Sequence, residues 1–260
     1  MKILVCLKQV PDSTVRVQVA SDGRTIATEG VTWSISPYYE YALEVALELK
    51  DADPATVVSA VTLGPARAKD ALRQALAMGC DDATLVTGAD AETLGGLAVA
   101  RVLARIVAER GPDLVLCGKQ ASDDDAGLVG AALAEARGWS HLAMVTKVAP
   151  AEGGVEVTRE VEGGHEVWRT KGPAVLTVHK SEKEPRYPTL PGIMKAKKKE
   201  IPELDLAGLL DDEARALPRA EIVRLEPPPA RGSGRMFTDG DIGATASELA
   251  RLLRDEAKVL

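Results

Sequence analysis

The stretch DLVLCGKQASDDDAGLVGAALAEARG, residues 113–138, contains the repeating unit on which the fold depends. Its first part, DLVLCG (113–118), is a short apolar run of the kind that forms a buried strand. Its last part, DDDAGLVGAALAEARG (123–138), has helical composition and ends at Gly138, in keeping with the preference of helix ends for glycine. The stretch therefore predicts a buried strand that leads through a polar loop, GKQASDDDAG (118–127), into a helix.

The same order of apolar run and helical pattern repeats upstream. We expect strands at residues 3–7, 56–63 and 83–87, and helices at residues 39–50, 65–79 and 92–110. Alternating strands and helices are typical of proteins whose parallel strands are joined by right-handed crossovers. The predicted fold class is therefore α/β, with a doubly wound, mostly parallel sheet.

The pattern changes after about residue 139. VEVTREVEGGHEVWRT (155–170) alternates around a Gly-Gly pair and predicts a β-hairpin, while PAVLTVHK (173–180) predicts one more buried strand. An Asp-Gly turn predicts a second hairpin at VRVQVASDGRTI (15–26). We divide the chain into an α/β domain (1–185), a basic segment (186–199) and a C-terminal arm (200–260).

The arm combines a Pro triplet at 227–229 with an amphipathic helix, SELARLLRDEAK (247–258). It has no obvious core of its own, so its apolar residues need a surface to cover. Either a partner chain or the arm's own domain meets that need, and the pattern alone does not choose between them.

Composition and charge exclude several classes of protein. A formal net charge of -7 and a pI near 5.2 argue against general nucleic-acid binding, which requires a broad basic face. No apolar run reaches the ~18 residues of a membrane helix, and the apolar run of MKILVCLK is too short for a signal peptide. Cys6, Cys80 and Cys117 show no CxxC spacing and are expected to be reduced. We expect a cytoplasmic protein with no insertion into membranes.

Signatures of self-contained catalysis are missing from the sequence. Gly118-Lys119 is followed by Gln120 and is not a P-loop, and no GxGxxG follows a strand. The three histidines lie apart, with no metal-ligand spacing. No catalytic residue and no metal site are predicted.

Two segments are expected to meet beyond the carboxyl ends of the strands, where open parallel sheets bind ligands. One is ISPYYE (35–40), which enters a helix, and the other is the loop GKQASDDDAG (118–127). Free N–H groups at the start of the second helix would suit an anion, with Gly127 giving close backbone access. The three aspartates fit helix capping equally well. A nucleotide site and simple capping both remain open on this pattern.

The stretch YPTLPGIMKAKKK (187–199) places four lysines in five positions of an acidic protein. A lysine run is usually a solvated face, and a basic helix end that contacts its own subunit is one interpretation. The adjoining Leu190, Ile193 and Met194 favour a docking site for another protein.

Four motifs together resemble one family, the β subunits of electron transfer flavoproteins (ETF). They are KILVCLKQVPDS, GKQASDDD, TREVEGG and EPRYPTLPGIMKAKKK, which together span most of the chain, and the last is highly specific. The resemblance implies a nucleotide-binding fold of the adenine nucleotide alpha hydrolase type. It also implies a heterodimer with an α subunit, FAD held mainly by that α subunit, and a structural AMP on the β subunit. The resemblance implies an electron-carrier subunit that is not an enzyme and is redox-active only together with the α subunit. It takes electrons from acyl-CoA dehydrogenases of fatty acid oxidation, and from related flavoprotein dehydrogenases, to an ETF-quinone oxidoreductase.

Carried over by position, the resemblance assigns roles to particular residues. Its AMP site comprises Cys6, Ser36, Pro37, Tyr38, Tyr39, Leu63, Gly118, Lys119, Gln120, Ala121, Ser122, Asp123, Asp124, Asp125, Ala126, Gly127, Leu128 and Val129. Its partner-recognition loop is 186–199, with Leu190 as the anchor beside Pro191, Ile193, Met194 and Lys195. Glu160 is implied at a subunit or domain contact that tunes movement of the flavin domain.

The sequence departs from the family pattern at two places. Members often have Asn where this chain has Ser36, and a Gln in the helix after the aspartates, where this chain has DDDAGLVG. A branch of the family binds a second FAD in place of AMP and bifurcates electrons, but the loop here is closer to the AMP-binding branch. A stand-alone nucleotide-binding regulator is a further alternative, although it gives residues 187–199 no purpose.

Overall fold

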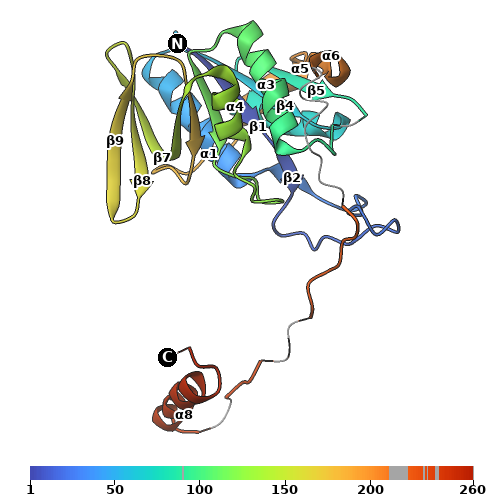
Figure 1. Cartoon of the computed structure of the whole chain (residues 1–260), viewed down its shortest axis with the longest axis vertical. Helices are drawn as coiled ribbons and strands as arrows, with labels where there is room; N and C mark the ends of the chain where they lie inside the picture. The colour runs from blue at the N-terminus through green and yellow to red at the C-terminus, as the bar shows by residue number, and fades with distance from the viewer. Residues whose placement is uncertain (90, 211–221, 231, 233, 238–239, 260) are drawn as a thin grey trace. The chain divides into compact units, whose positions relative to one another are not determined.

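The computed structural model describes the chain except residues 90, 211–221, 231, 233, 238–239 and 260 (Figure 1). The chain divides into two compact units, Met1–Arg224 and Leu225–Leu260, and each is described by itself. The first unit contains the sheet and the candidate site.

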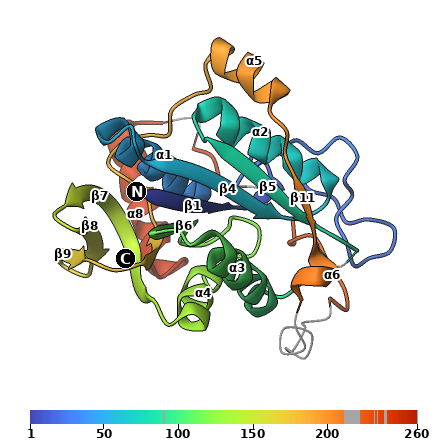
Figure 2. The ribbon, with the colours of Figure 1, turned by 90° about the horizontal axis from the view of Figure 1, so that it is seen from above.

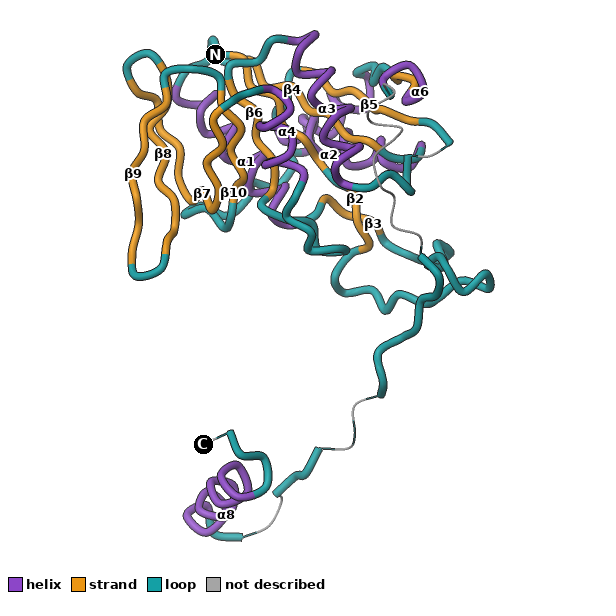
Figure 3. Tube along the Cα trace, viewed as in Figure 1, coloured by secondary structure: helices purple, strands orange, loops and turns teal. Residues whose placement is uncertain are grey.

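Within the described residues, a nine-stranded sheet has the order β11-β5-β4-β1-β6-β10-β7-β8-β9. Its strands are β1 (Lys2–Leu7), β4 (Val57–Leu63), β5 (Asp82–Thr87), β6 (Leu114–Gly118), β7 (Ser140–Ala151), β8 (Gly154–Val161), β9 (Gly164–Thr170), β10 (Ala174–Val178) and β11 (Glu203–Asp205). Neighbours from β11 to β7 pair in parallel, whereas β7, β8 and β9 pair antiparallel and lie side by side at one end of the sheet (Figure 3). The predicted doubly wound, mostly parallel sheet is therefore confirmed.

Helices cover both faces of this sheet. In the first unit they are α1 (Pro37–Ala52), the 3-10 turn η1 (Ala66–Ala68), α2 (Lys69–Met78), α3 (Gly96–Arg110), α4 (Val129–Arg137), α5 (Leu190–Lys198) and α6 (Leu206–Leu209). Figure 2 shows α1 and α2 on one face and α3 and α4 on the other. The strands between them are rich in Val, Leu and Ile, and β6 and β10 are buried along their whole length, as expected for strands covered on both sides.

Two helices begin later than the sequence pattern predicts. The helix predicted from residue 123 begins at Val129, and the one predicted from residue 92 begins at Gly96. The first is delayed because Asp125 (φ 49°) and Gly127 (φ 60°) have left-handed backbone, which cannot continue a right-handed helix. The second follows Gly95, and consecutive glycines are poor helix formers.

The hairpin predicted at residues 15–26 is present only in part, because backbone hydrogen bonds join residues 18–20 to residues 25–27 but the segment contains no strand. This segment contains one isolated bridge, between Val19 and Ile26, because a short polar pair of strands has no third strand or apolar face to support it. A small two-stranded sheet forms instead from β2 (Gln9–Pro11) and β3 (Trp33–Ile35) at its base.

The boundary predicted for the C-terminal arm at residue 200 is too early. Strand β11 adds to the edge of the chain's own sheet in parallel with β5. The buried residues Ile201, Leu206 and Leu209 pack into the same core. Residues 211–221 lie outside the described residues, so the arm can be followed again only beyond them. In the second unit, helix α8 (Ile242–Asp255) contains residues 247–255 of the amphipathic helix predicted at 247–258, which ends three residues earlier than predicted. The helix is capped by Asp241, whose carboxylate accepts a hydrogen bond from the N–H of Ala244.

Candidate functional site

The two segments predicted to meet at the carboxyl ends of the strands are in contact. Ser36, which precedes α1, is buried, and its hydroxyl accepts a hydrogen bond of 3.1 Å from the backbone N–H of Ser122. The N–H of Ser36 donates to the carbonyl oxygen of Lys8, just after β1 (2.9 Å). The loop after β1, the start of α1 and the loop after β6 are thereby joined at one edge.

Gly118 ends β6 directly against the start of α1. A Cβ atom at this position would lie 2.6 Å from Cδ2 of Tyr39 and 2.9 Å from the carbonyl carbon of Tyr38. No side chain fits at such distances, so the close approach requires glycine. Burial of Tyr39 beneath the loop raises the pKa of its phenol well above the usual value.

Each of the three aspartates of the loop has a side-chain partner, and one lysine offsets the charges of two of them. Nζ of Lys8 donates to Asp123 (2.8 Å) and to Asp124 (2.9 Å). Nε2 of Gln120 donates to Asp125 (2.7 Å). Among the described residues, no group of His, Cys, Asp or Glu is arranged to hold a metal ion. The triplet is therefore an ion-paired turn.

This turn does not cap helix α4. The residue at the N-cap is Leu128, and no side chain accepts from the first N–H groups of the helix. Those N–H groups consequently have no partner within the helix and face the carboxyl edge with a partial positive charge. The capping interpretation of the aspartates is wrong, and an anion can be accepted at the end of the helix that they leave open.

The remaining residues of the predicted site lie at different depths. Pro37 and residues 122–128 are exposed, Lys119 and Gln120 are half-buried, and Ala121 is buried. Cys6 is buried behind the edge, where a hydrogen bond to Cys117 and burial both raise the pKa of its thiol. Leu63, at the end of β4, is half-buried against the core. All three cysteines are free, as expected.

Glu160 lies next to a row of side chains, His179, Tyr38 and Lys119, that extends to the same edge. Its carboxylate lies 3.8 Å from Nδ1 of His179, whose ring centroid is 5.3 Å from that of Tyr38. Nζ of Lys119 lies 5.2 Å from the centroid of the Tyr38 ring. Burial and the nearby Lys119 charge lower the pKa of His179 against the opposing effect of Glu160, so His179 is neutral at pH 7.

Sequence reasoning missed Lys8 and His179. Each follows a strand that it identified, β1 and β10, by a single position. This placement at the carboxyl end of a predicted strand is the signal by which both residues could have been found.

The basic segment folds into α5, a second exposed feature far from this edge in sequence. Thr189 caps the helix by accepting from the N–H of Gly192 (3.1 Å). Gly192 lies against α2, where a Cβ would come within 2.3 Å of the carbonyl oxygen of Ala77. Ile193 packs on the core, while Leu190 is 79% exposed and Met194 59%.

The lysines of this segment behave in two ways. Nζ of Lys199 donates to the carbonyl oxygens of Cys80 (3.1 Å) and Asp81 (2.6 Å) and so fastens the end of the segment to its own subunit. Lys195, Lys197 and Lys198 are exposed in the last turn of α5. Pro191 is exposed too, and so is Tyr187, which sequence reasoning did not include. Lys199 thus fits a basic helix end that contacts its own subunit, while docking through the exposed residues stays a prediction.

The fold and the strand-end site define a doubly wound α/β protein of the class that binds ligands at the carboxyl edge of its sheet. A family model described as the electron transfer flavoprotein domain matches residues 23–209. The chain is 40% identical over 260 residues to the electron transfer flavoprotein subunit beta of Bradyrhizobium diazoefficiens, covering 100% of both chains. It is 39% identical over 255 residues to the human subunit beta, covering 97% of this chain and 99% of that one. The mitochondrial subunit beta of Oryza sativa subsp. indica is 40% identical over 262 residues, with 100% of both covered.

The chain belongs to the electron transfer flavoprotein family, as a β subunit. A β subunit implies an α-subunit partner, and the family is one of flavoproteins that carry electrons. Across the described residues, none of the helices combines the length and the apolar character that crossing a membrane requires.

Proposed function

We propose that this β subunit and its α subunit form a carrier that takes electrons from acyl-CoA dehydrogenases and other flavoprotein dehydrogenases to an ETF-quinone oxidoreductase. FAD is held mainly by the α subunit, and the β subunit holds a structural AMP. The chain is redox-active only in that complex. The observation that carries this proposal is Leu190, a large apolar side chain left 79% exposed on a helix that is otherwise fastened to its own subunit.

AMP is proposed at the edge where Ser36 and Ser122 meet. The open N-terminus of α4 supplies N–H donors suited to a phosphate group. Lys8 offsets the charges of Asp123 and Asp124, which would otherwise repel that phosphate. The half-buried ring of Tyr38 and the half-buried Leu63 offer apolar surface for a base. The residues present therefore fit the group.

Docking is proposed through α5, with Leu190 as the anchor and Pro191, Ile193 and Met194 around it. Burial of Leu190 in a partner's pocket contributes about 1.5–3 kcal/mol. An ion pair of an exposed lysine such as Lys195 contributes only ~0–1 kcal/mol, less at high salt. The apolar residues then hold the partner, while the lysines steer acidic partners and raise the rate of association.

Two further contacts belong to the same proposal. Glu160 contacts the neighbouring subunit or domain at the carboxyl edge, where its carboxylate lies 3.8 Å from Nδ1 of His179. The C-terminal unit, Leu225–Leu260, packs on the α subunit, and the amphipathic α8 with its exposed Ile242 and Leu249 supports this. The carrier acts in the cytoplasm, a location that suits three free thiols.

Leu190→Ala tests the docking proposal in the heterodimer. The measurement is the rate at which an acyl-CoA dehydrogenase, reduced by its acyl-CoA, transfers electrons to the carrier as carrier concentration is varied. We expect KM for the carrier to rise about tenfold or more, from the lost burial, with nucleotide content unchanged. Val17→Ala, at an exposed valine of the first polar loop, is the matched control. An unchanged KM for Leu190→Ala would contradict docking through α5.

A further inference from the structure

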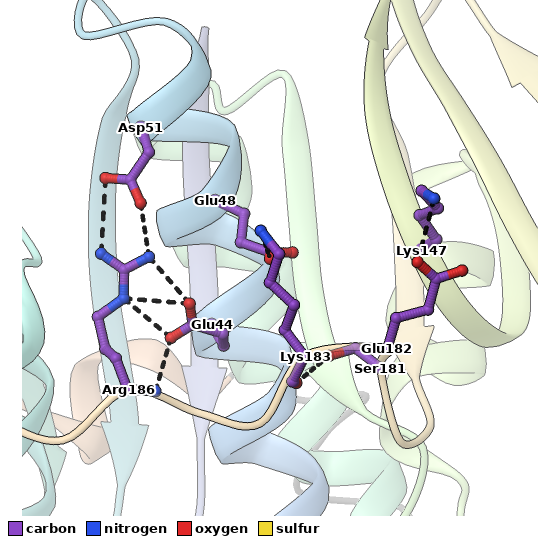
Figure 4. Close-up of polar contacts among 8 residues, drawn as sticks. All are labelled: Glu44, Glu48, Asp51, Lys147, Ser181, Glu182, Lys183 and Arg186. Carbon is purple, nitrogen blue, oxygen red and sulfur yellow. Dashed lines mark hydrogen bonds and ion pairs between the residues drawn. The ribbon is translucent and has the colours of Figure 1, made fainter.

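Helix α5 is joined to β10 by a segment of residues 179–189, which we call the strap. The strap crosses α1, and Arg186 is its central contact (Figure 4). Nε of Arg186 donates to both carboxylate oxygens of Glu44 (3.1 and 2.9 Å) and Nη2 donates to one of them (2.9 Å). Nη2 also donates to Asp51, about two helical turns further along the same face of α1 (2.6 Å). A single guanidinium thus bridges two carboxylates of the same helix.

Glu44 is the feature that makes this contact unusual. It is only 4% exposed, and a buried carboxylate is tolerated in a protein when it is paired and hydrogen-bonded. Besides the guanidinium, the backbone N–H of Arg186 donates to Glu44 (2.9 Å). The carboxylate therefore holds the main chain of the strap at residue 186 as well as its side chain.

The neighbouring ion pairs of the strap differ in kind. Lys183 pairs with Glu48 of α1 at 2.7 Å, but the Lys183 side chain is 74% exposed. Lys147 pairs with Glu182 at 3.0 Å, with both side chains largely exposed. Exposed pairs of this sort contribute little to holding a chain in place. Of these three ion pairs, only the one between Arg186 of the strap and Glu44 of α1 has a fully buried member.

The two ends of α5 are held by different means. At its far end, Nη1 of Arg73 on α2 donates to the carbonyl oxygens of Ala196 (2.6 Å) and Lys199. At its near end Leu190 lies four residues after Arg186, with the exposed Tyr187 between them. The first turn of α5 is placed on the subunit by Gly192 and Ile193, and Arg186 fixes the chain that leads into that turn.

We propose that Glu44 and Arg186 form a positioning pair, which fixes the strap to α1 and thereby presents Leu190 in the orientation that a partner requires. This inference rests on the proposed docking function. A held anchor binds more tightly than a mobile one, because less conformational entropy is lost when the complex forms.

The test replaces both members of the pair, Glu44→Leu with Arg186→Met, so that no buried charge is left without a partner. The variant heterodimer is assayed as electron acceptor for a medium-chain acyl-CoA dehydrogenase with octanoyl-CoA. We expect KM for the carrier to rise on the order of fivefold with kcat unchanged. Lys183→Met, on the same strap, is the control and is expected to leave KM unchanged.

A merely structural pair would lower thermal stability without this change in KM, and that result would overturn the proposal. Hydrogen exchange gives a second readout: the amides of Arg186, Tyr187, Thr189 and Leu190 exchange faster in the double variant, while the amides of α1 keep their protection. Equal exchange in this segment would also overturn it. If the double variant does not fold, Arg186→Lys is tested in its place. Its ammonium keeps the positive charge but lacks the planar set of donors with which the guanidinium bridges Glu44 and Asp51. An intermediate KM is then expected, and an unchanged one would contradict the proposal.

Adding Leu190→Ala to each background separates this inference from docking itself. If Leu190 is the anchor that the pair orients, its removal raises KM by a smaller factor in the double variant than in the unmodified chain. Equal factors in both backgrounds would show that Leu190 acts independently of the pair. No effect of Leu190→Ala in either background would instead contradict the docking function.

Discussion

The hydroxyl of Ser36 and the backbone N–H of Ser122 form a hydrogen bond of 3.1 Å across 86 residues of sequence. Ser36 begins the crossing that α1 makes over one face of the sheet, and Ser122 lies in the loop that leads to α4 on the other face. The bond therefore joins the two halves of the proposed AMP site at the edge where the sheet's two layers of helices meet.

Ser36→Ala removes this bond and leaves the backbone N–H of Ser122 without its acceptor. A hydrogen bond of this type has a net contribution of about 0.5–1.5 kcal/mol, so we expect AMP to bind about two- to tenfold more weakly. The measurement is titration of AMP into the nucleotide-free heterodimer by calorimetry.

Ser59→Ala is the matched control for Ser36→Ala. It removes the hydrogen bond of 2.7 Å between Ser59 on β4 and Asp82, near the opposite ends of the strands. This control is expected to leave AMP affinity as it is. Equal losses from both substitutions would mean that general stability, and not the contact at the edge, controls binding.

Gly118→Ala places a methyl group where Tyr39 and the Tyr38 backbone already lie. The contact distances of 2.6 and 2.9 Å require the start of α1 to move away from β6. Overpacking of this kind costs about 1–3 kcal/mol, and we expect the free energy of unfolding to fall by that amount in urea titrations, with AMP lost from the purified protein.

Gly172→Ala provides the comparison for Gly118→Ala, because a Cβ at Gly172 has no heavy atom within 4 Å. Its free energy of unfolding is expected to stay within about 0.5 kcal/mol of the unmodified chain. A Gly118→Ala protein as stable as this control would show that α1 and β6 are not held at the distance described.

Lowering the pH is expected to destabilise the loop at residues 118–128, because Asp124 becomes protonated. Burial opposes ionisation of this carboxyl, but hydrogen bonds from Lys8 and from the N–H of Ala126 outweigh it and lower its pKa. Because the folded-state pKa lies below the unfolded one, the stabilisation is fully present above the ordinary Asp value of about 3.9 and is lost as pH falls through the folded-state value.

Hydrogen exchange of the loop amides between pH 3 and pH 6, corrected for intrinsic rates, measures this loosening. Asp124→Asn and Lys8→Met each remove the ion pair between these two residues. Each should make amide exchange in the loop less dependent on pH below about pH 4. Because both act on one interaction, the double variant should be no flatter than either alone. If the exchange rates of the loop amides depend on pH in all three variants as strongly as in the unmodified chain, the role given to Asp124 is contradicted.

The sequence predicted those parts of the fold that depend on local pattern. Strand β6 and the end of α4 at Gly138 follow from an apolar run and a helix-ending glycine. The start of α4 could not be found in the same way, because it depends on the left-handed backbone at Asp125, a conformation that few non-glycine residues adopt. Strand β11 was missed because ELD is three residues long and forms only by adding to the edge of β5.

The site was predictable to a similar degree. Placement at the carboxyl ends of strands was enough to predict that Ser36 and the loop after Gly118 lie together. The ion pairs of Lys8 were beyond the sequence pattern, since its partners Asp123 and Asp124 lie 115 and 116 residues away. The hydrogen bonds between Arg186 and Glu44, 142 residues apart, were missed for the same reason. Such contacts depend on the three-dimensional fold and leave no local periodicity.

Identification of the bound nucleotides tests the central proposal most directly. The chain is purified together with its α subunit and denatured, and the released nucleotides are separated by chromatography and identified by mass. One AMP and one FAD per heterodimer are expected from a carrier with AMP at the carboxyl edge of this subunit. Two FAD and no AMP would contradict this and indicate the electron-bifurcating branch, while ATP on a chain purified without a partner would contradict the carrier function altogether.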